Sequence, residues 1–295
     1  MTKNQNFDHR PTWADKIPKP PAPRNIAHIM LNFESPEEVR ARRDDLVSLL
    51  RTGSLLARKL ARKLKSCKKG KRCGSGACPI CSRMFRLWLT GELLRIFFPF
   101  GDGVQDAPQS SDQGEPVLAV SLIPKSLQRA SGKLNKADMA NAMDQLRNQL
   151  RRNGLGQLMV AGGMDVAFNE DRDQRWEAYW QPHFYLLARE STMLEIRDSL
   201  KKYFPSDDTI MIPIHGRLVR STLEDRGRAA SYVWKSAFFR RVSTLTPKGN
   251  AGRPWEYPMK TAQKRELAIW LDKYSPTDRL FLQNIRRRGW RLSLE

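Results

Sequence analysis

Residues 179–188 read YWQPHFYLLA, and this run decides the fold because it marks a buried strand with reactive side chains on it. Short apolar runs of this length are typical of strands. On a strand, His183 and Tyr185 point to one face and Phe184 to the other. Asp165, in the strand expected just before, is the carboxylate expected to lie beside them. His183, Tyr185 and Asp165 could therefore form a metal site; the alternative is a histidine hydrogen-bonded within a sheet.

Further strands and helices are predicted on both sides of this run. Asn135 is expected to cap the first helix, and Gly162-Gly163 to interrupt the second strand. The order strand-helix-strand-strand-helix-strand is that of ferredoxin-like folds, where helices cover one face of an antiparallel sheet. We therefore predict an α+β domain, with strands at 117–123, 158–168, 179–188 and 209–218 and helices at 135–153, 191–203 and 225–241.

Composition divides the rest of the chain. Five prolines within the first 25 residues predict an extended arm. Ser35, Pro36 and Glu38 form a capping box that begins a helix, and an apolar helix is expected at 84–98. We expect an arm at 1–34, a basic helical region at 35–101, a linker at 102–116, the α+β domain at 117–243, and a basic helical C-terminal extension at 244–295, in which a loop runs to Pro258 and helices lie near 262–273 and 276–288.

The charge of the chain points to a polyanionic partner. Among 295 residues, 52 are Lys or Arg and 31 are Asp or Glu, which gives a formal net charge of +21. Residues 51–91 contain no acid. The chain has no apolar run long enough for a membrane span and no secretory signal, so we expect a cytoplasmic protein that binds nucleic acid and no membrane. The expected DNA contacts are Arg58, Lys59, Arg62, Lys63, Lys68, Lys69, Lys71, Arg72 and Arg83.

All four cysteines lie in this acid-free stretch, as Cys67-x5-Cys73-x4-Cys78-x2-Cys81. Four thiolates within a short loop are a typical tetrahedral zinc site, and a Cys-x2-Cys knuckle supplies two ligands from one turn. The surrounding cations favour thiolates. We expect structural zinc, since four thiolates leave no open position for chemistry. The alternative is a set of buried or redox-active thiols.

Tyr232 and Lys235 lie three residues apart on the helix predicted at 225–241 and so share a face. A phenol is a poor nucleophile at neutral pH, and nearby cations with a metal-polarised phosphate would be needed to activate it. The alternative is an ordinary aromatic residue on a helix face.

Residues 117–241 resemble the plasmid-type rolling-circle replication initiators, which belong to the HUH (His-hydrophobic-His) endonucleases. The resemblance lies in the strand at 117–123, the strand around Asp165, Trp180-x-Pro182-His183-x-Tyr185 and Tyr232-x2-Lys235. Relatives often carry a cysteine cluster that ends in Cys-Pro-x-Cys with a following Arg, and Cys78-Pro79-Ile80-Cys81-Ser82-Arg83 is similar to it.

The resemblance implies a DNA nicking and joining enzyme. His183, Asp165 and Tyr185 would hold Mg²⁺ or Mn²⁺, and Tyr232 would attack the scissile phosphate of single-stranded DNA to form a 5′-phosphotyrosine. Lys235 would stabilise the developing charge. Origin DNA, a host helicase and a host polymerase would be the partners.

One position departs from the family pattern, because Tyr185 stands where relatives have the second histidine. A neutral phenol binds these metals less readily than an imidazole. This leaves two hypotheses: an active nuclease with an altered metal site, or a decayed nuclease that only binds DNA. A third hypothesis, an RNA-binding zinc protein, fits the charge but does not account for the order of the elements.

Overall fold

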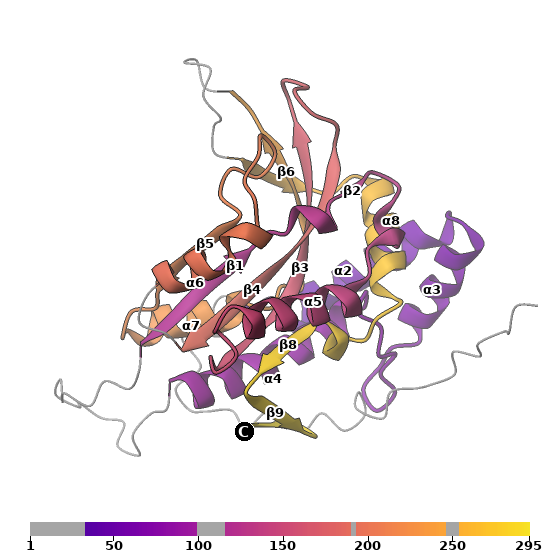
Figure 1. Cartoon of the computed structure of the whole chain (residues 1–295). Coiled ribbons are helices and arrows are strands. Elements are labelled where there is room, and N and C mark those ends of the chain that lie inside the picture. Colours follow the sequence, from indigo (N-terminus) through magenta and orange to yellow (C-terminus); the bar gives the residue numbers. More distant parts are fainter. Residues whose placement is uncertain (1–32, 99–115, 190–192, 246–253) are drawn as a thin grey trace, which may run out of the picture.

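The computed structural model describes residues 33–98, 116–189, 193–245 and 254–295. The expected arm and linker therefore lie, except at their last one or two residues, outside the described residues. The described chain is an α+β fold built on an eight-stranded mixed sheet, as Figure 1 shows. Among the helices described, none combines the length and apolar character that crossing a bilayer requires.

The centre of the sheet is formed by β5 (Ile214–Leu218), β1 (Val117–Leu122), β4 (Tyr179–Arg189) and β3 (Val160–Asp171), in that order, and all neighbours are antiparallel. Four more strands complete it, and three of them are β2, β6 and β7. The short β2 (Arg129–Ala130) pairs with β4, and β6 (Phe239–Ser243) runs parallel to β3 and pairs with β7 (Trp255–Pro258). The sheet is therefore mixed, not wholly antiparallel as predicted.

The last strand of the sheet, β8 (Leu280–Gln283), comes from the segment that the sequence predicted to be a helical extension. It pairs with residues 160–163 of β3, while β6 pairs with residues 168–171 of the same strand. Both therefore occupy the edge of β3 that faces away from β4. Within the described chain, no strand pairs with residues 164–167 on that edge, and Asp165 lies in this interval.

Helices cover both faces of the sheet rather than one. On one face, α5 (Met139–Arg152) and α6 (Met193–Leu200) pack on a core that includes Phe184 and Leu186. On the other face, α4 (Pro79–Phe97) and α7 (Leu223–Tyr232) pack on Leu187 and its neighbours. The alternation of side chains along β4 separates these two cores, and His183 and Tyr185 point to the α4 and α7 side.

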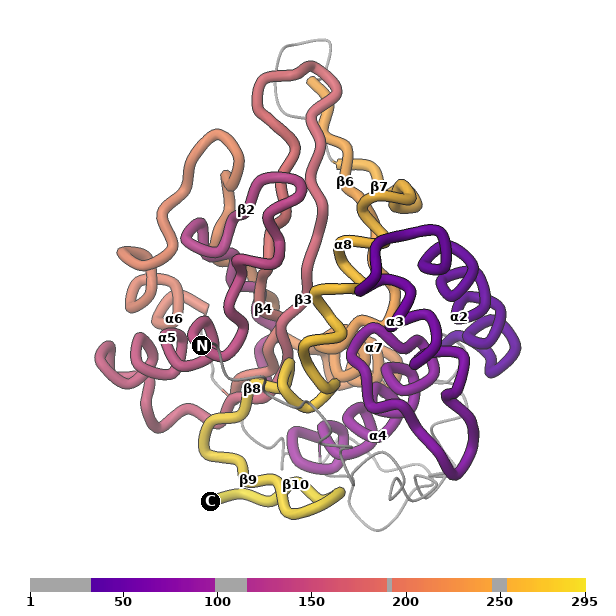
Figure 2. Tube along the Cα trace, turned by 90° about the vertical axis from the view of Figure 1, so that its right-hand side faces the viewer, coloured from indigo at the N-terminus to yellow at the C-terminus, as the bar shows by residue number. Residues whose placement is uncertain are grey.

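A third group of helices stands beside the sheet. The capping box of Ser35 and Glu38 begins α2 (Pro36–Arg51), as predicted. Helices α3 (Leu55–Lys65) and α8 (Thr261–Leu271) pack against α2, and the predicted helix at 262–273 is confirmed by α8. Figure 2, turned by 90°, shows the three helices together at one side of the molecule.

Several predicted boundaries are wrong. Asp138, not Asn135, caps α5, because residues 134–136 form a 3₁₀ turn. The strand predicted from residue 209 begins only at Ile214. The helix predicted to run to Arg241 ends at Tyr232, and the chain then turns into β6. The expected loop to Pro258 contains β7. The helix predicted at 276–288 is a 3₁₀ turn (Pro276–Arg279) followed by β8 and by β9 (Ile285–Arg288), which forms a hairpin with β10 (Arg291–Leu294).

The glycine pair in β3 is a site of close approach, not an interruption of the strand. A Cβ atom on Gly162 would lie 2.0 Å from the carbonyl oxygen of Tyr185, and one on Gly163 would lie 2.9 Å from the ring of Trp234. Residue 163 must therefore lack a side chain for the segment after α7 to rest on the strand.

Candidate active site and candidate metal centre

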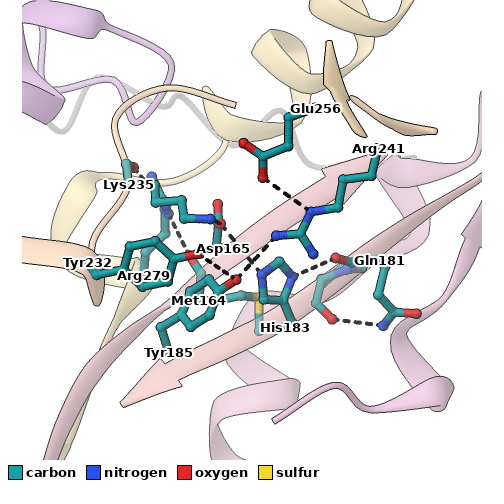
Figure 3. Close-up of polar contacts among 11 residues, drawn as sticks. Met164, Asp165, Gln181, His183, Tyr185, Tyr232, Lys235, Arg241, Glu256 and Arg279 are labelled. Carbon is teal, nitrogen blue, oxygen red and sulfur yellow. Dashed lines mark hydrogen bonds and ion pairs between the residues drawn. The ribbon is translucent and has the colours of Figure 1, made fainter. Parts of the chain in front are cut away.

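Asp165 on β3 and His183 on β4 are direct cross-strand partners, and both side chains are buried. Figure 3 shows them beside two tyrosines, Tyr185 from β4 and Tyr232 from the end of α7. The predicted set of Asp165, His183, Tyr185, Tyr232 and Lys235 is therefore brought together in one place.

The hydrogen bonding of His183 fixes its tautomer. Its Nδ1 lies 3.0 Å from the carbonyl oxygen of Gln181, which can only accept, so Nδ1 carries the proton. Burial lowers the pKa of His183 to about 4, against the opposing effect of Asp165, so the ring is neutral near pH 7. Its Nε2 therefore presents a lone pair, 3.5 Å from Oδ2 of Asp165.

Two buried acceptors thus face each other. Neither Nε2 of His183 nor Oδ1 of Asp165 has a hydrogen-bond partner among the described residues. Acceptors without donors are costly in a protein interior, and a cation is the kind of group that satisfies both.

Lys235 supplies one cation to this place. Its Nζ lies 3.3 Å from Oδ2 of Asp165. Burial raises the pKa of Asp165, but Lys235, His183 and Arg279 outweigh burial and hold it below its usual value. Burial lowers the pKa of Lys235, yet Asp165 and the two tyrosines raise it further than burial lowers it. Both groups are therefore charged at neutral pH, although Lys235 lies beyond the end of α7 and not on the helix as predicted.

The two tyrosines connect this buried pair to solvent. Tyr232 is 46% exposed, and its Oη donates to Oη of Tyr185 at 3.4 Å. Nζ of Lys235 lies 4.5 Å from the ring centre of Tyr232 and 4.7 Å from that of Tyr185. Burial raises the pKa of Tyr185 to about 12, so its phenol stays protonated. Tyr232 is therefore the accessible hydroxyl of the site.

Two arginines that the sequence analysis missed complete the cluster. Nη2 of Arg241, on β6, donates to Oη of Tyr185 at 3.4 Å. Arg279, which is 1% exposed, donates to the carbonyl oxygens of Met164 and Lys235. Arg241 was missed because the sequence predicts it at the end of a helix, whereas it lies in β6. Nothing in the sequence distinguishes Arg279 from the many other arginines.

The donor set suits a divalent ion only in part. Asp165 and His183 offer one carboxylate and one imidazole with unpartnered atoms, which Mg²⁺ or Mn²⁺ accept when waters or a phosphate complete the shell. The protonated phenol of Tyr185 is a weak third ligand, and Lys235 already balances the charge of Asp165. The site therefore offers two good protein ligands, Asp165 and His183, and its positive charge comes from Lys235, Arg241 and Arg279.

The four cysteines form a second centre, between α3 and α4. Their sulfur atoms all lie within 4.8 Å of one another, with Cys67 and Cys73 at 3.7 and 3.8 Å from Cys81, and all four are free thiols. A zinc ion with bonds of about 2.3 Å spaces its sulfur ligands about 3.8 Å apart in a tetrahedron. The four cysteines could therefore hold a metal ion such as zinc.

The surroundings of the cluster fit a metal as well. The neighbouring thiols lower the pKa of Cys67. They raise the pKa of Cys78 and Cys81, and burial raises these two further, so Cys78 and Cys81 favour the neutral thiol unless a cation is bound. The backbone N–H of Gly76 donates to the carbonyl oxygen of Tyr274 at 2.8 Å, and a Cβ there would lie 2.8 Å from the same oxygen. The loop is therefore held against the end of α8.

Most of the predicted DNA contacts lie at the surface of α3 and of the turn that follows it. Lys63 is paired with Asp272 at 2.7 Å, and Arg72 is half-buried. Arg83 differs from the rest, because it is half-buried in α4 and its Nε donates to the carbonyl oxygen of Glu34 at 2.6 Å. It ties α4 to the chain that precedes α2 rather than forming part of the basic surface.

A separate cavity of about 1420 Å³ lies beside the far end of β3 and β4. It is lined by the β3–β4 turn and by Arg240 and Tyr257, which pair across β6 and β7. Arg241 and Arg240 are neighbours on β6 and point to opposite faces, so this cavity is not part of the site around Asp165.

Comparisons with protein-family models, with curated proteins and with solved structures find no match to this chain.

Proposed function

We propose that this chain nicks and rejoins single-stranded DNA at a replication origin of a plasmid or phage, with Tyr232 as the nucleophile. The observation that supports this most is the layering of the site. An exposed phenol lies against a charged lysine, above a buried carboxylate and imidazole whose acceptor atoms lack partners. This arrangement suits a reaction at a phosphodiester, because the lysine offsets the negative charge that the phosphodiester brings to the exposed phenol.

In the proposed step, Oη of Tyr232 attacks the scissile phosphorus and forms a 5′-phosphotyrosine, and the bond to the 3′ oxygen breaks. The phenol loses its proton, and the departing 3′ oxygen takes one up, so the exchange of one phosphodiester for another is balanced. Lys235 and Arg241 contribute positive charge where the phenolate and the phosphate develop theirs. Reversal of the step rejoins the strand, and the freed 3′-hydroxyl would prime synthesis by a host polymerase behind a host helicase.

His183 and Asp165 would hold Mg²⁺ or Mn²⁺, which would supply further charge neutralisation at the scissile phosphate. The protein itself positions both side chains, because cross-strand pairing holds the two backbones and the Gln181 carbonyl oxygen accepts from the imidazole ring. Tyr185 acts as a hydrogen-bonding support for Tyr232 and not as a strong ligand.

We also propose that the fold has a ferredoxin-like core and that the cysteine centre holds structural zinc. The antiparallel order β5-β1-β4-β3, with α5 and α6 as crossover helices, supports a ferredoxin-like core to which β2, β6, β7 and β8 are added. The sulfur spacing supports structural zinc at Cys67, Cys73, Cys78 and Cys81.

The test is a search for covalent protein–DNA adducts. The purified chain is incubated with Mn²⁺ and a library of random single-stranded oligonucleotides, and adducts that survive denaturation are isolated and sequenced. We expect adducts that share a short sequence and that disappear in Tyr232→Phe. The matched control is Tyr203→Phe, in the 3₁₀ turn after α6, which should leave the yield unchanged. Equal yields from wild type and Tyr232→Phe, or none from either across the library, would overturn the proposal.

A second candidate function is a DNA-binding protein that has lost the nuclease. It is favoured by the protonated phenol of Tyr185 in a ligand position and by the ion pair between Lys235 and Asp165. This candidate predicts strongly salt-dependent DNA binding that survives Tyr232→Phe and His183→Ala while no adduct forms with any substrate.

A further inference from the structure

Helices α2 and α3 are joined by a short, tight turn. Only Thr52, Gly53 and Ser54 separate the two helices, and Ser54 caps α3 by accepting from the N–H of Ala57. A Cβ atom on Gly53 would lie 2.8 Å from the Cβ of Ala57 and 3.3 Å from the carbonyl oxygen of Leu50. The turn is therefore so tight that glycine is required there, which is typical of the turn in a helix-turn-helix.

Helix α3 presents one apolar and one basic face. Ala57, Leu60, Ala61 and Leu64 are buried, while the arginines and lysines of the helix are exposed. A groove of about 310 Å³ lies on this helix and is lined by Arg51 of α2 and by Leu55, Arg58, Ala61, Arg62 and Lys65 of α3, which follow one another at helical spacing. At the first turn of the helix, Leu55 is 58% exposed and Leu56 is 63% exposed.

The positive charge of this groove is not balanced within the described chain. In the described chain, no carboxylate forms an ion pair with Arg51, Arg58, Arg62 or Lys65. Their neighbours in sequence offer no carboxylate either, since residues 51–91 contain no acid. By contrast, Lys63, at the other side of the helix, is paired with Asp272. Uncompensated cations in register along one helix face fit the phosphates of a polyanion.

We propose that α2 and α3 form a helix-turn-helix that places α3 in the major groove of duplex DNA, at a site separate from Tyr232. The width of the B-form major groove admits one helix, whereas the deep, narrow major groove of A-form RNA does not. The first turn of the second helix is the part that meets base edges in such complexes, and here it exposes two leucines that suit thymine methyl groups. This inference stands on α2 and α3 and does not depend on the nucleophile.

Charge-removing substitutions on α3 test the surface. The variant combines Arg58→Gln, Arg62→Gln and Lys65→Gln in the full chain. The control combines Arg197→Gln in α6 with Lys201→Gln and Lys202→Gln in the 3₁₀ turn that follows it, which removes the same formal charge from exposed positions. Affinity is measured by fluorescence anisotropy for a random-sequence duplex DNA, a single strand of the same length and a duplex RNA, each over a range of salt concentrations.

We expect the α3 variant to lose about tenfold or more in affinity for duplex DNA, with a shallower salt dependence, and to lose much less for the other two nucleic acids. The α6 control should lose less than the α3 variant for the duplex. Equal losses for the two variants, or equal losses on duplex DNA, single strand and RNA, would overturn the proposal, because they would indicate a general charge effect. Thermal unfolding of each variant checks that its fold is retained.

Two further measurements separate this proposal from the proposed nicking activity. Leu55→Ala with Leu56→Ala should change which sequences are selected from a duplex library without changing the salt dependence; unchanged selection would contradict base contact by α3. Tyr232→Phe should retain duplex binding, and the α3 variant should still form adducts with short single strands if the nicking proposal holds. Loss of duplex binding in Tyr232→Phe would show that the two sites are not separate.

Discussion

Nε of Arg279 donates to the carbonyl oxygen of Met164 at 3.0 Å, in the interval of β3 that neither β6 nor β8 pairs with. Nη2 of the same guanidinium donates to the carbonyl oxygen of Lys235 at 3.3 Å, and its plane stacks on Trp234 at 4.3 Å. One buried side chain thus joins the residue before Asp165 to the lysine that pairs with it. Burial lowers the pKa of Arg279 to about 10, so it remains charged at neutral pH.

Arg279→Lys should therefore separate positioning from stability. A lysine cannot donate to both carbonyls in the same geometry, so we expect a loss of about 1–3 kcal/mol in the free energy of unfolding. We also expect a lower yield of covalent adduct under conditions where the variant is fully folded, because Lys235 is no longer held beside Asp165. Denaturant unfolding and the adduct assay measure the two effects. Arg288→Lys, at an exposed position of β9, is the control. A folded Arg279→Lys with wild-type yield would contradict the positioning role.

Gly163→Ala tests the contact between β3 and the segment after α7. The added Cβ would lie 2.9 Å from the ring of Trp234 and 3.1 Å from the carbonyl oxygen of Val233. We expect a loss of about 1–3 kcal/mol in the free energy of unfolding, as for other overpacked cores. Gly91→Ala in α4 is the matched control, because nothing lies within 4 Å of its new methyl group. It should be neutral or stabilise by about 0.5–1 kcal/mol. Similar effects of the two substitutions would contradict the packing argument.

The sequence predicted the centre of the fold because its signals there are local. The strands around Leu118, Ala161 and Leu187 are apolar runs bounded by polar segments, and the capping box at Ser35 requires only neighbours in sequence. The pairing of Asp165 with His183 followed from one assumption, that the second and third strands are adjacent. The four cysteines were found from their spacing alone.

The parts that the sequence did not predict depend on contacts between distant residues. Residues 280–283 (LFLQ) form an apolar run that suits a strand or a helix, and only the free edge of β3 decides between them. The same holds for residues 239–243, where β3 and β7 select a strand. Arg279 carries no local signal, since its role arises from a gap between two other strands.

Removal of metal tests the cysteine centre. Protein purified under reducing conditions should contain about one zinc ion per chain by elemental analysis, and Cys78→Ser should contain much less. Chelation should lower the thermal unfolding midpoint by roughly 10 °C, since a few kcal/mol are lost and each corresponds to about 2–4 °C at this chain length. Ser66→Ala, at an exposed position beside the cluster, should retain the metal and the midpoint. A reduced, metal-free wild type with an unchanged midpoint would contradict a structural metal.

Acidification should destabilise the chain through His183. Its pKa is about 4 in the folded state and about 6.5 when unfolded, so between these values the unfolded chain binds the extra proton. The free energy of unfolding should therefore fall as the pH decreases from about 6.5 to 4, by on the order of 3 kcal/mol. Because the pKa of Asp165 is lowered in the folded state, protonation of this carboxylate decreases the free energy of unfolding only at still lower pH. Denaturant titrations at several pH values measure the slope, which should flatten in His183→Asn but not in the exposed His215→Asn. An equal slope in both variants would assign the effect to other groups.

Tyr185→His tests whether the phenol limits metal binding. An imidazole on the same face of β4 as His183 would be a third good ligand where the protonated phenol is a weak one. We expect the Mn²⁺ concentration for half-maximal adduct formation to fall by about tenfold or more, and calorimetric titration of zinc-loaded protein with Mn²⁺ to show tighter binding. Tyr185→Phe removes the hydroxyl without adding a ligand and should not tighten Mn²⁺ binding. If the two variants bind Mn²⁺ equally, Asp165 and His183 do not form a metal site, and the cations of Lys235 and Arg241 are left as the only source of positive charge near Tyr232.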